Sequence, residues 1–169
     1  MRTKKTVLLG LLTAIALTIF MIEAHIPAPV PIPGIKLGLS NIVTVFTVFA
    51  IGSWEGAAVL VCRVFLGAVF AGNFSTIFYS GAGGLCAITV TILLKKILTG
   101  RQLWVAGSLG AMAHSIGQMA AAIAITATPS LSVYLPILLL CSILTGLFTG
   151  LCAQLVLNRG EKIWKTFLR

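Results

Sequence analysis

The chain has 169 residues, enough for one domain, and 59% of them are hydrophobic while only 9% are charged. A soluble protein of this size must cover itself with polar side chains, so a mean hydropathy of +1.10 excludes a soluble globule and indicates a lipid environment. The net charge of +9 comes from 12 Lys and Arg against three Glu. Because these basic residues lie mostly between apolar runs, we attribute them to membrane topology and not to nucleic acid.

Six apolar runs in the chain are candidates for membrane-spanning helices, because a span needs about 20 mostly apolar residues. The second and third runs are short and lie close together. The sequence therefore predicts an all-α integral membrane protein with a single domain over residues 1–169. The six predicted helices cover about 7–24, 37–52, 54–72, 75–98, 103–127 and 131–157.

The basic residues indicate how the chain is oriented. Ten of the twelve lie in the N-terminal segment, between the fourth and fifth runs, or in the C-terminal tail. If the N-terminus is cytoplasmic, all three segments are inside, the outer segments hold only Lys36, and Arg63 lies within a span. Because Lys and Arg accumulate in cytoplasmic segments, we expect both termini to be cytoplasmic.

The first outer segment, residues 25–36, has an unusual composition for a loop. In the stretch IPAPVPIPGIK, prolines fall at every second position from Pro27 to Pro33. Proline fixes φ and favours extended geometry in the residue before it, so we expect an open arm without helical hydrogen bonds. Val30 and Ile32 make the arm apolar, so it should fold back on an apolar surface. It is either a lid over a cavity or a simple hydrophobic strap.

Polar side chains collect between the midplane and the outer ends of the predicted spans. Arg63 stands nine residues after Trp54 and His114 ten residues after Trp104, so the two have nearly the same depth at about 1.5 Å per residue. Gln118 follows one turn further out on the same helix face. The other polar residues of this outer region are Glu23, His25, Lys36, Asn41 and Asn73.

Two interpretations of these polar residues are open. A charged side chain at the bilayer centre is unfavourable by roughly 3 kcal/mol on insertion scales, so each should have a partner. They can act as contacts between helices, with Arg63 paired to Glu23 and His114 hydrogen-bonded across helices. Alternatively, beneath a lid-like arm, they line a ligand pocket that opens to the outside.

Lys36 bears on the charge of such a ligand, because it lies beside the predicted start of the second helix. A helix N-terminus presents unpaired N–H groups and positive potential, which broken helices in transporters use to hold anions. With Arg63 below it, Lys36 favours a ligand that carries a carboxylate or a phosphate. In the alternative interpretation, Lys36 reaches lipid headgroups and contacts no ligand.

Small residues on the first helix indicate a close helix contact. Gly10, Ala14 and Thr18 are spaced four apart and form a stripe on which another helix can pack. The stripe is either internal packing or a docking face for another membrane protein. The chain has no G-x-x-x-x-G-K-[ST] motif, metal-ligand cluster or nucleophile motif, so we expect no catalytic residue, metal or cofactor.

Four segments carry a resemblance to a known family: PGIKLGLSNIVTVF, CRVFLGAVFAGNFS, LGAMAHSIGQMAAA and YLPILLLCSILTGLFTGL. In this order they cover nearly the whole chain. They resemble the bacterial Gx transporters, a family also called heptaprenyl diphosphate synthase component I. That family is similar to the substrate-binding S components of energy-coupling factor transporters.

The resemblance implies a six-helix subunit of the bacterial plasma membrane, with a ligand pocket near the outer face and the first outer loop as its lid. It implies that the first helix docks through its small residues on a membrane coupling protein driven by two ATPases. One departure from the family is Ser115, where Asn is frequent. The ligand-binding positions that the resemblance implies are Lys36, Asn41, Arg63, Asn73, His114 and Gln118. Glu23 and His25 are further candidates from their position alone.

The synthase in the second family name is not the activity we expect of this chain. Prenyl diphosphate synthases hold magnesium and diphosphate with aspartate-rich motifs, because hard cations need carboxylate oxygens. The sequence contains no Asp, and its three Glu are far apart. The name can instead reflect a partnership with isoprenoid or quinone pathways.

Two functions remain to be distinguished. The first is a binding and translocation subunit for a small anionic organic ligand, related to a vitamin, an isoprenoid or a redox cofactor and energised by separate proteins. The second is a membrane accessory or assembly subunit of isoprenoid-quinone metabolism or electron transfer. In that case its polar residues bind a partner protein, a lipid or a quinone.

Overall fold

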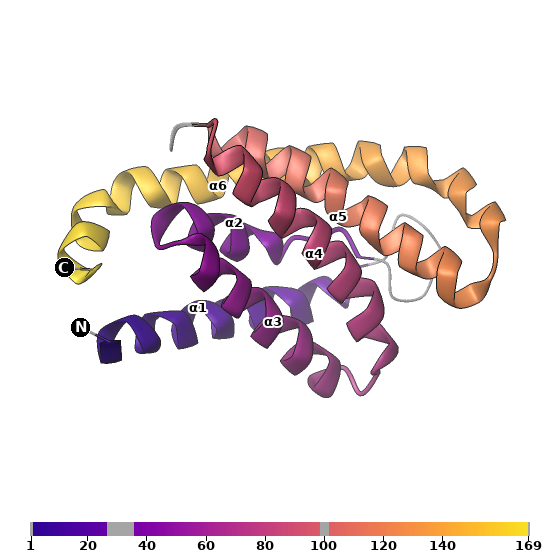
Figure 1. Ribbon diagram of the computed structural model, residues 1–169, viewed down its shortest axis with the longest axis horizontal. Helices are drawn as coiled ribbons and strands as arrows, with labels where there is room; N and C mark the ends of the chain where they lie inside the picture. Colours follow the sequence, from indigo (N-terminus) through magenta and orange to yellow (C-terminus); the bar gives the residue numbers. More distant parts are fainter. Residues whose placement is uncertain (1, 27–35, 99–101, 169) are drawn as a thin grey trace.

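The computed structural model describes residues 2–26, 36–98 and 102–168, and every regular element in these ranges is helical. The prediction of an all-α protein is therefore confirmed for the described residues. In chain order the elements in Figure 1 are α1 (Arg2–Glu23), α2 (Asn41–Ala50), α3 (Ser53–Phe70), α4 (Ser75–Lys95), α5 (Leu103–Thr126), the 3-10 helix η1 (Pro129–Tyr134) and α6 (Leu135–Leu168).

Within the described residues, five segments are long and apolar enough to cross a membrane: α1, α3, α4, α5 and the stretch formed by η1 with most of α6. Helix α2 is the exception. It has 10 residues and is about 15 Å long, roughly half of the hydrocarbon thickness of a bilayer. A continuous helix over residues 37–52 is therefore not formed, and the described residues do not confirm the predicted count of six spanning helices.

Helix α2 is short because the backbone leaves helical geometry on both sides of it. Gly38 has a φ of +81°, a left-handed conformation through which the helix cannot extend. At the other end, Gly52 is extended, and Ile51 and Gly52 both donate their N–H groups to the carbonyl of Thr47. The apolar residues of the sequence continue through both points, so hydropathy alone does not indicate these ends.

The other helices differ from the predicted ranges mainly at their ends. Helix α1 begins at Arg2 instead of residue 7, and α4 ends at Lys95 instead of residue 98. Pro129 begins the short helix η1, so α6 starts only at Leu135 and continues beyond residue 157 to Leu168. Proline is well suited to the first turn of a helix, because its missing N–H group has no partner there.

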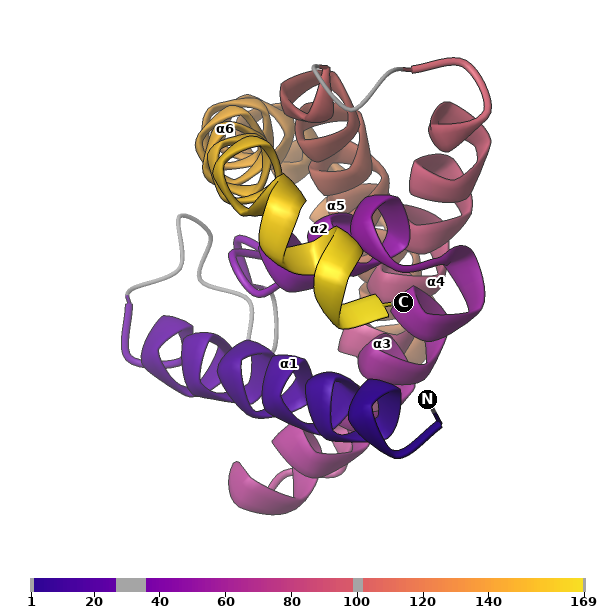
Figure 2. The ribbon, with the colours of Figure 1, turned by 90° about the vertical axis from the view of Figure 1, so that its left-hand side faces the viewer.

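Helix α2 lies inside the bundle, and Figure 2 shows it enclosed by the longer helices. Its buried Val45 and Phe46 belong to one apolar cluster with Leu8 and Leu12 of α1. Apolar side chains also cover much of the outside of the protein, as a surface in contact with lipid requires. The fold thus places a short, largely buried helix inside a lipid-facing bundle.

Glycines allow α5 and α6 to approach each other closely. A Cβ atom at Gly150 of α6 would lie 2.6 Å from the carbonyl oxygen of Leu103 on α5. Gly107 and Gly146 are equally close to the facing backbone. Ser115 of α5 shares a buried hydrogen bond of 2.5 Å with Ser142 of α6. Small residues at such crossings are typical of helix packing in membranes.

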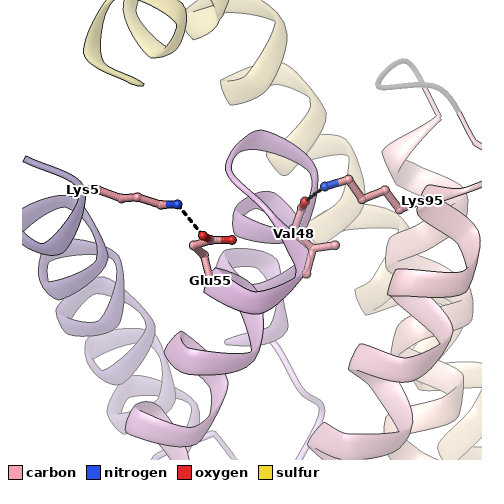
Figure 3. A network of polar contacts seen from close by, with 4 residues as sticks. All are labelled: Lys5, Val48, Glu55 and Lys95. Atoms are coloured by element: carbon pink, nitrogen blue, oxygen red, sulfur yellow. Dashed lines mark hydrogen bonds and ion pairs between the residues drawn. The ribbon is translucent and has the colours of Figure 1, made fainter. Parts of the chain in front are cut away.

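The start of α1 and the end of α6 lie at the same end of the bundle (Figure 1). Two polar contacts join helices at this end, as Figure 3 shows. Lys5 of α1 forms an ion pair with Glu55 in the first turn of α3, and Lys95 of α4 donates to the carbonyl of Val48 near the end of α2, at 2.5 Å. We call these two pairs the terminus-end contacts.

Candidate functional site

Six of the eight polar residues singled out in the sequence lie together in the interior. Glu23 ends α1, Lys36 precedes α2, and Asn41 begins it. Arg63 comes from the middle of α3, and His114 and Gln118 lie on consecutive turns of α5. We call Glu23, Lys36, Ser40, Asn41, Arg63, His114 and Gln118 the buried polar cluster; Lys36 is half-buried and the other six are buried.

The turn before α2 brings part of this cluster together. The positive φ of Gly38 aims its N–H group at Glu23, whose Oε1 atom accepts the hydrogen bond at 2.5 Å. A Cβ atom at Gly38 would also lie 3.0 Å from the Asn41 amide nitrogen and 3.2 Å from the His114 ring. The absence of a side chain therefore lets the turn lie against both of these residues.

Arg63 is the largest polar side chain of the cluster and is only 1% exposed. Its Nη1 atom donates a hydrogen bond to the hydroxyl of Ser40, whereas Nε and Nη2 have no partner. Arg63 and Glu23 interact electrostatically, but among the described residues no ion pair joins them. The direct pairing expected if these residues served only as a contact between helices is therefore not formed.

His114 and Gln118 lie one turn apart on α5, facing Gly83 of α4. The backbone N–H of Lys36 donates to the Gln118 Oε1 atom at 3.3 Å, which leaves the Nε2 atom without a partner. The His114 ring lies against Gly83, and its Nδ1 atom has no partner. A Cβ atom at Gly83 would lie 2.8 Å from the His114 carbonyl oxygen, so only glycine permits this approach.

Lys36 is half-buried, and its ammonium lies over an aromatic ring. The Nζ atom is 3.4 Å from the centroid of Phe20, and the guanidinium of Arg63 is 5.9 Å from the same centroid. Burial lowers the pKa of Lys36 below its usual value; nearby Glu23 opposes this effect and Arg63 adds to it. The negative face of the ring holds the ammonium at the edge of the cluster.

The cluster contains more buried polar atoms than its own hydrogen bonds satisfy. Within the described residues, eight buried side-chain nitrogen and oxygen atoms lack a partner. Seven of them belong to the cluster: Glu23 Oε2, Asn41 Nδ2 and Oδ1, Arg63 Nε and Nη2, His114 Nδ1 and Gln118 Nε2. The eighth is Thr44 Oγ1 on α2. Buried polar groups in proteins are almost always hydrogen-bonded. Their concentration here indicates a place for further polar atoms, either from water or from a ligand.

The other two predicted residues lie apart from the cluster. Asn73 is exposed between α3 and α4, where its side-chain oxygen accepts hydrogen bonds from the N–H and hydroxyl of Ser75. It therefore stabilises the start of α4. His25 is exposed, and its ring bonds to the carbonyl of Met21 at 2.9 Å. The predicted lid lies almost wholly within residues 27–35, outside the described residues.

The small-residue stripe of α1 lies on the outside of the bundle. Gly10, Ala14 and Thr18 are all exposed. Gly10 and Ala14 also line an apolar groove of about 490 Å³ between α1 and α3, whose opposite wall includes Ala58 and Cys62. A groove with such low walls can accept a further helix or an apolar chain.

Sequence reasoning missed several residues that build the cluster. Ser40 resembles an ordinary helix cap in the sequence, yet its hydroxyl is the partner of Arg63. Phe20 resembles any other lipid-facing aromatic residue, yet it lies under Lys36. Gly38 offered a signal, because a glycine between a proline-rich arm and a helix start is a candidate for a left-handed turn.

The model of the family described as heptaprenyl diphosphate synthase component I matches residues 12–156. The chain belongs to this family. The matched range includes every member of the buried polar cluster and most of the α1–α3 groove. Comparisons with curated proteins and with solved structures found no significant match.

Proposed function

We propose that the chain is the substrate-binding and translocation subunit of an importer related to energy-coupling factor transporters, and that it takes up a small anionic organic ligand. The observation that carries the proposal is the set of seven unpartnered polar atoms in the buried polar cluster. Such a set, enclosed within a lipid-facing bundle, is unfavourable unless something completes its hydrogen bonds. In this proposal, a ligand that enters from outside the cell completes these hydrogen bonds.

The unpartnered atoms describe the ligand in outline. Arg63, Asn41 and Gln118 offer N–H donors, so the ligand should present several acceptors. Glu23 and His114 offer acceptor atoms, so it should also present a donor. Counting two cations and one carboxylate, the cluster carries a net charge of +1, which favours one negative group. A vitamin, an isoprenoid derivative or a redox cofactor with an acidic group would satisfy this description.

In this proposal the chain crosses a bacterial plasma membrane with both termini inside. The common location of the two chain ends in Figure 1 supports an even number of crossings. Helix α2 with the segment before it would then supply one crossing as a broken helix, a feature that transporters use at their binding sites. Residues 25–36 would form the lid on the outer side.

Energy for transport would come from separate proteins. The sequence holds no ATP-binding motif, and the exposed stripe of Gly10, Ala14 and Thr18 offers a face on α1 for a membrane coupling protein with two ATPases. We infer that the chain itself is not an enzyme, since it contains no aspartate with which to hold magnesium and diphosphate. The family name would then describe a pathway partner.

A second candidate function is supported by the α1–α3 groove. Its apolar lining could receive a helix of another membrane protein, a lipid or a quinone tail. In that case the chain would be an accessory or assembly subunit of isoprenoid-quinone metabolism or electron transfer, and the buried polar cluster would serve the integrity of the fold.

Native mass spectrometry of protein extracted into lipid nanodiscs distinguishes the two candidates. We expect wild type and Lys95→Gln to retain a small molecule near one-to-one stoichiometry and Arg63→Gln to lose it. Lys95 is the matched control because it is a part-buried lysine away from the cluster. Retention of a partner protein without any small molecule favours the accessory function. Robust uptake by this chain alone in proteoliposomes contradicts the need for separate energising proteins.

A further inference from the structure

The carboxylate of Glu23 is held in a manner unusual for the last residue of a helix. It is 3% exposed, and its Oε1 atom accepts the N–H of Gly38 at 2.5 Å. The backbone N–H groups of Leu39 and Ser40 interact with the same carboxylate. These three amides lead into α2, whose N-terminus adds positive potential. The Glu23 side chain thus occupies an anion-binding turn.

A buried cation adjoins this turn and still has free donors. Arg63 contacts Ser40, the last residue of the turn, through Nη1, while its Nε and Nη2 atoms have no partner. Lys36 also interacts electrostatically with Glu23. Because no ion pair joins Arg63 to Glu23 within the described residues, the guanidinium keeps its donors for an acceptor that Glu23 does not supply.

We propose that residues 38–40 and Arg63 form a carboxylate-binding site and that Glu23 occupies only its backbone half in the absence of ligand. A carboxylate from outside can take the place of Glu23 and also pair with the free donors of Arg63. Consecutive backbone N–H groups and the planar fork of a guanidinium together match a flat, two-oxygen anion. If the proposed function holds, the competing group is the acidic group of the transported ligand. The inference then narrows the ligand to a carboxylic acid.

Displacement of Glu23 would break a contact between the end of α1 and the turn before α2. Glu23 ends α1, the helix that carries the exposed stripe of Gly10, Ala14 and Thr18. Release of its side chain from residues 38–40 would free the end of α1 from the start of α2. Ligand occupancy would thereby reach the proposed docking face of α1.

Chemical rescue tests the site without knowledge of the natural ligand. Glu23→Ala removes a methylene and a carboxylate, which together correspond to one molecule of acetate. We expect this variant to lose roughly 5 °C or more in Tm, because it leaves buried donors and a buried cation without their anion. Acetate or formate at about 100 mM should restore at least half of the loss in a saturable manner. Acetamide and sulfate at equal ionic strength should not.

Three matched variants make the rescue specific. Wild type should respond little to acetate, because Glu23 already occupies the site. Glu55→Ala, which removes the carboxylate of a terminus-end contact, should show no rescue. The double variant Glu23→Ala/Arg63→Gln should also lose the rescue, since half of the proposed site is gone.

Equal stabilisation of all variants by acetate, or none of Glu23→Ala, overturns the inference. If Glu23→Ala cannot be purified, extraction with and without acetate replaces the melting experiment. Recovery only with acetate supports the site, and failure in both while Glu23→Gln is recovered contradicts it. Rescue without any retained metabolite leaves the carboxylate site standing and counts against transport. If acetate fails to rescue Glu23→Ala but wild type retains a metabolite that Arg63→Gln loses, the carboxylate site is contradicted and the proposed transport function stands.

Discussion

The buried polar cluster and the terminus-end contacts use the same residue types in opposite ways. At the terminus end, Lys5 pairs with Glu55 and Lys95 donates to the Val48 carbonyl (Figure 3). These contacts are partly exposed. In the cluster, Arg63 and Glu23 are almost fully buried yet do not form an ion pair with each other. The two regions hold similar numbers of charged groups, but only in the cluster do charged side chains keep buried polar atoms without a hydrogen-bond partner.

This difference separates a structural role from a binding role. The terminus-end contacts answer local needs of helix ends, since Lys95 satisfies one of the last carbonyls of α2 and Glu55 lies in the first turn of α3. In the cluster, hydrogen bonds to Glu23, Arg63 and Gln118 account for only part of the polar atoms, and seven buried ones remain unpartnered. Substitutions in the two regions should therefore affect different measured quantities.

The largest effect on binding should come from Arg63→Gln, with His114→Ala close to it. Each should weaken the affinity for the molecule retained by wild type tenfold or more, or about 1.4 kcal/mol, because each removes a direct polar contact. Affinity and Tm should be measured on the same purified variants. If Arg63 serves only as a contact between helices, Arg63→Gln will lower Tm and leave the affinity per folded molecule unchanged.

Two glycine substitutions sharpen the comparison without altering charge. Gly83→Ala forces a methyl group against the His114 backbone and the Gln118 side chain, so it should reduce both affinity and Tm. Gly107→Ala creates a similar clash where α5 crosses α6, away from the cluster. It should lower Tm by several degrees and leave affinity nearly unchanged. Equal losses of affinity in the two variants would contradict a localised site.

The sequence was sufficient to predict the convergence of Arg63, His114 and Gln118, because depth along a straight helix follows from a rise of about 1.5 Å per residue. It was insufficient for α2, whose ends depend on the left-handed turn at Gly38 and not on hydropathy. Asn73 has the same depth argument in its favour, yet its side chain stabilises the start of α4. Position along the membrane normal does not specify the direction in which a side chain points.

The partners of Arg63 illustrate a second limit of sequence reasoning. If the polar residues serve as contacts between helices, Glu23 is the predicted partner of Arg63. In the structure, the turn before α2 takes the Glu23 carboxylate with backbone N–H groups, and Ser40 takes the guanidinium. The sequence does not show which backbone N–H groups will bind a charged side chain. Sequence reasoning therefore tends to pair such a side chain with an oppositely charged residue instead.

Lys36→Gln should weaken binding less than Arg63→Gln, since Lys36 lies at the edge of the cluster over Phe20. Its effect should also depend on pH. Burial lowers the pKa of Lys36 below its usual 10.5, so an anionic ligand should lose affinity as the pH rises through this lowered pKa. Affinity should be measured from neutral pH towards 10.5. It should fall with pH in wild type and stay level in Lys36→Gln.

The same shift has a consequence for stability, of opposite sign. Because folding disfavours the charged form of Lys36, the unfolded chain binds the proton more tightly. The resulting loss in the free energy of unfolding is present below the lowered pKa and disappears as the pH approaches 10.5. Lys36→Gln should remove this pH dependence. A wild-type affinity that rises with pH would contradict a direct contact between Lys36 and an anion.

The smallest effects should come from the terminus-end contacts. Lys5→Gln removes an ion pair whose lysine is 44% exposed, and exposed pairs contribute about 0–1 kcal/mol. The Tm should therefore fall by only a few degrees, and the fall should shrink in high salt because screening weakens the pair in wild type. Affinity for the retained molecule should match that of wild type, since α2 keeps the contact between Lys95 and Val48. A tenfold loss of affinity in Lys5→Gln would mean that the two ends of the bundle are coupled through α2, and the distinction between a structural and a binding region would fail.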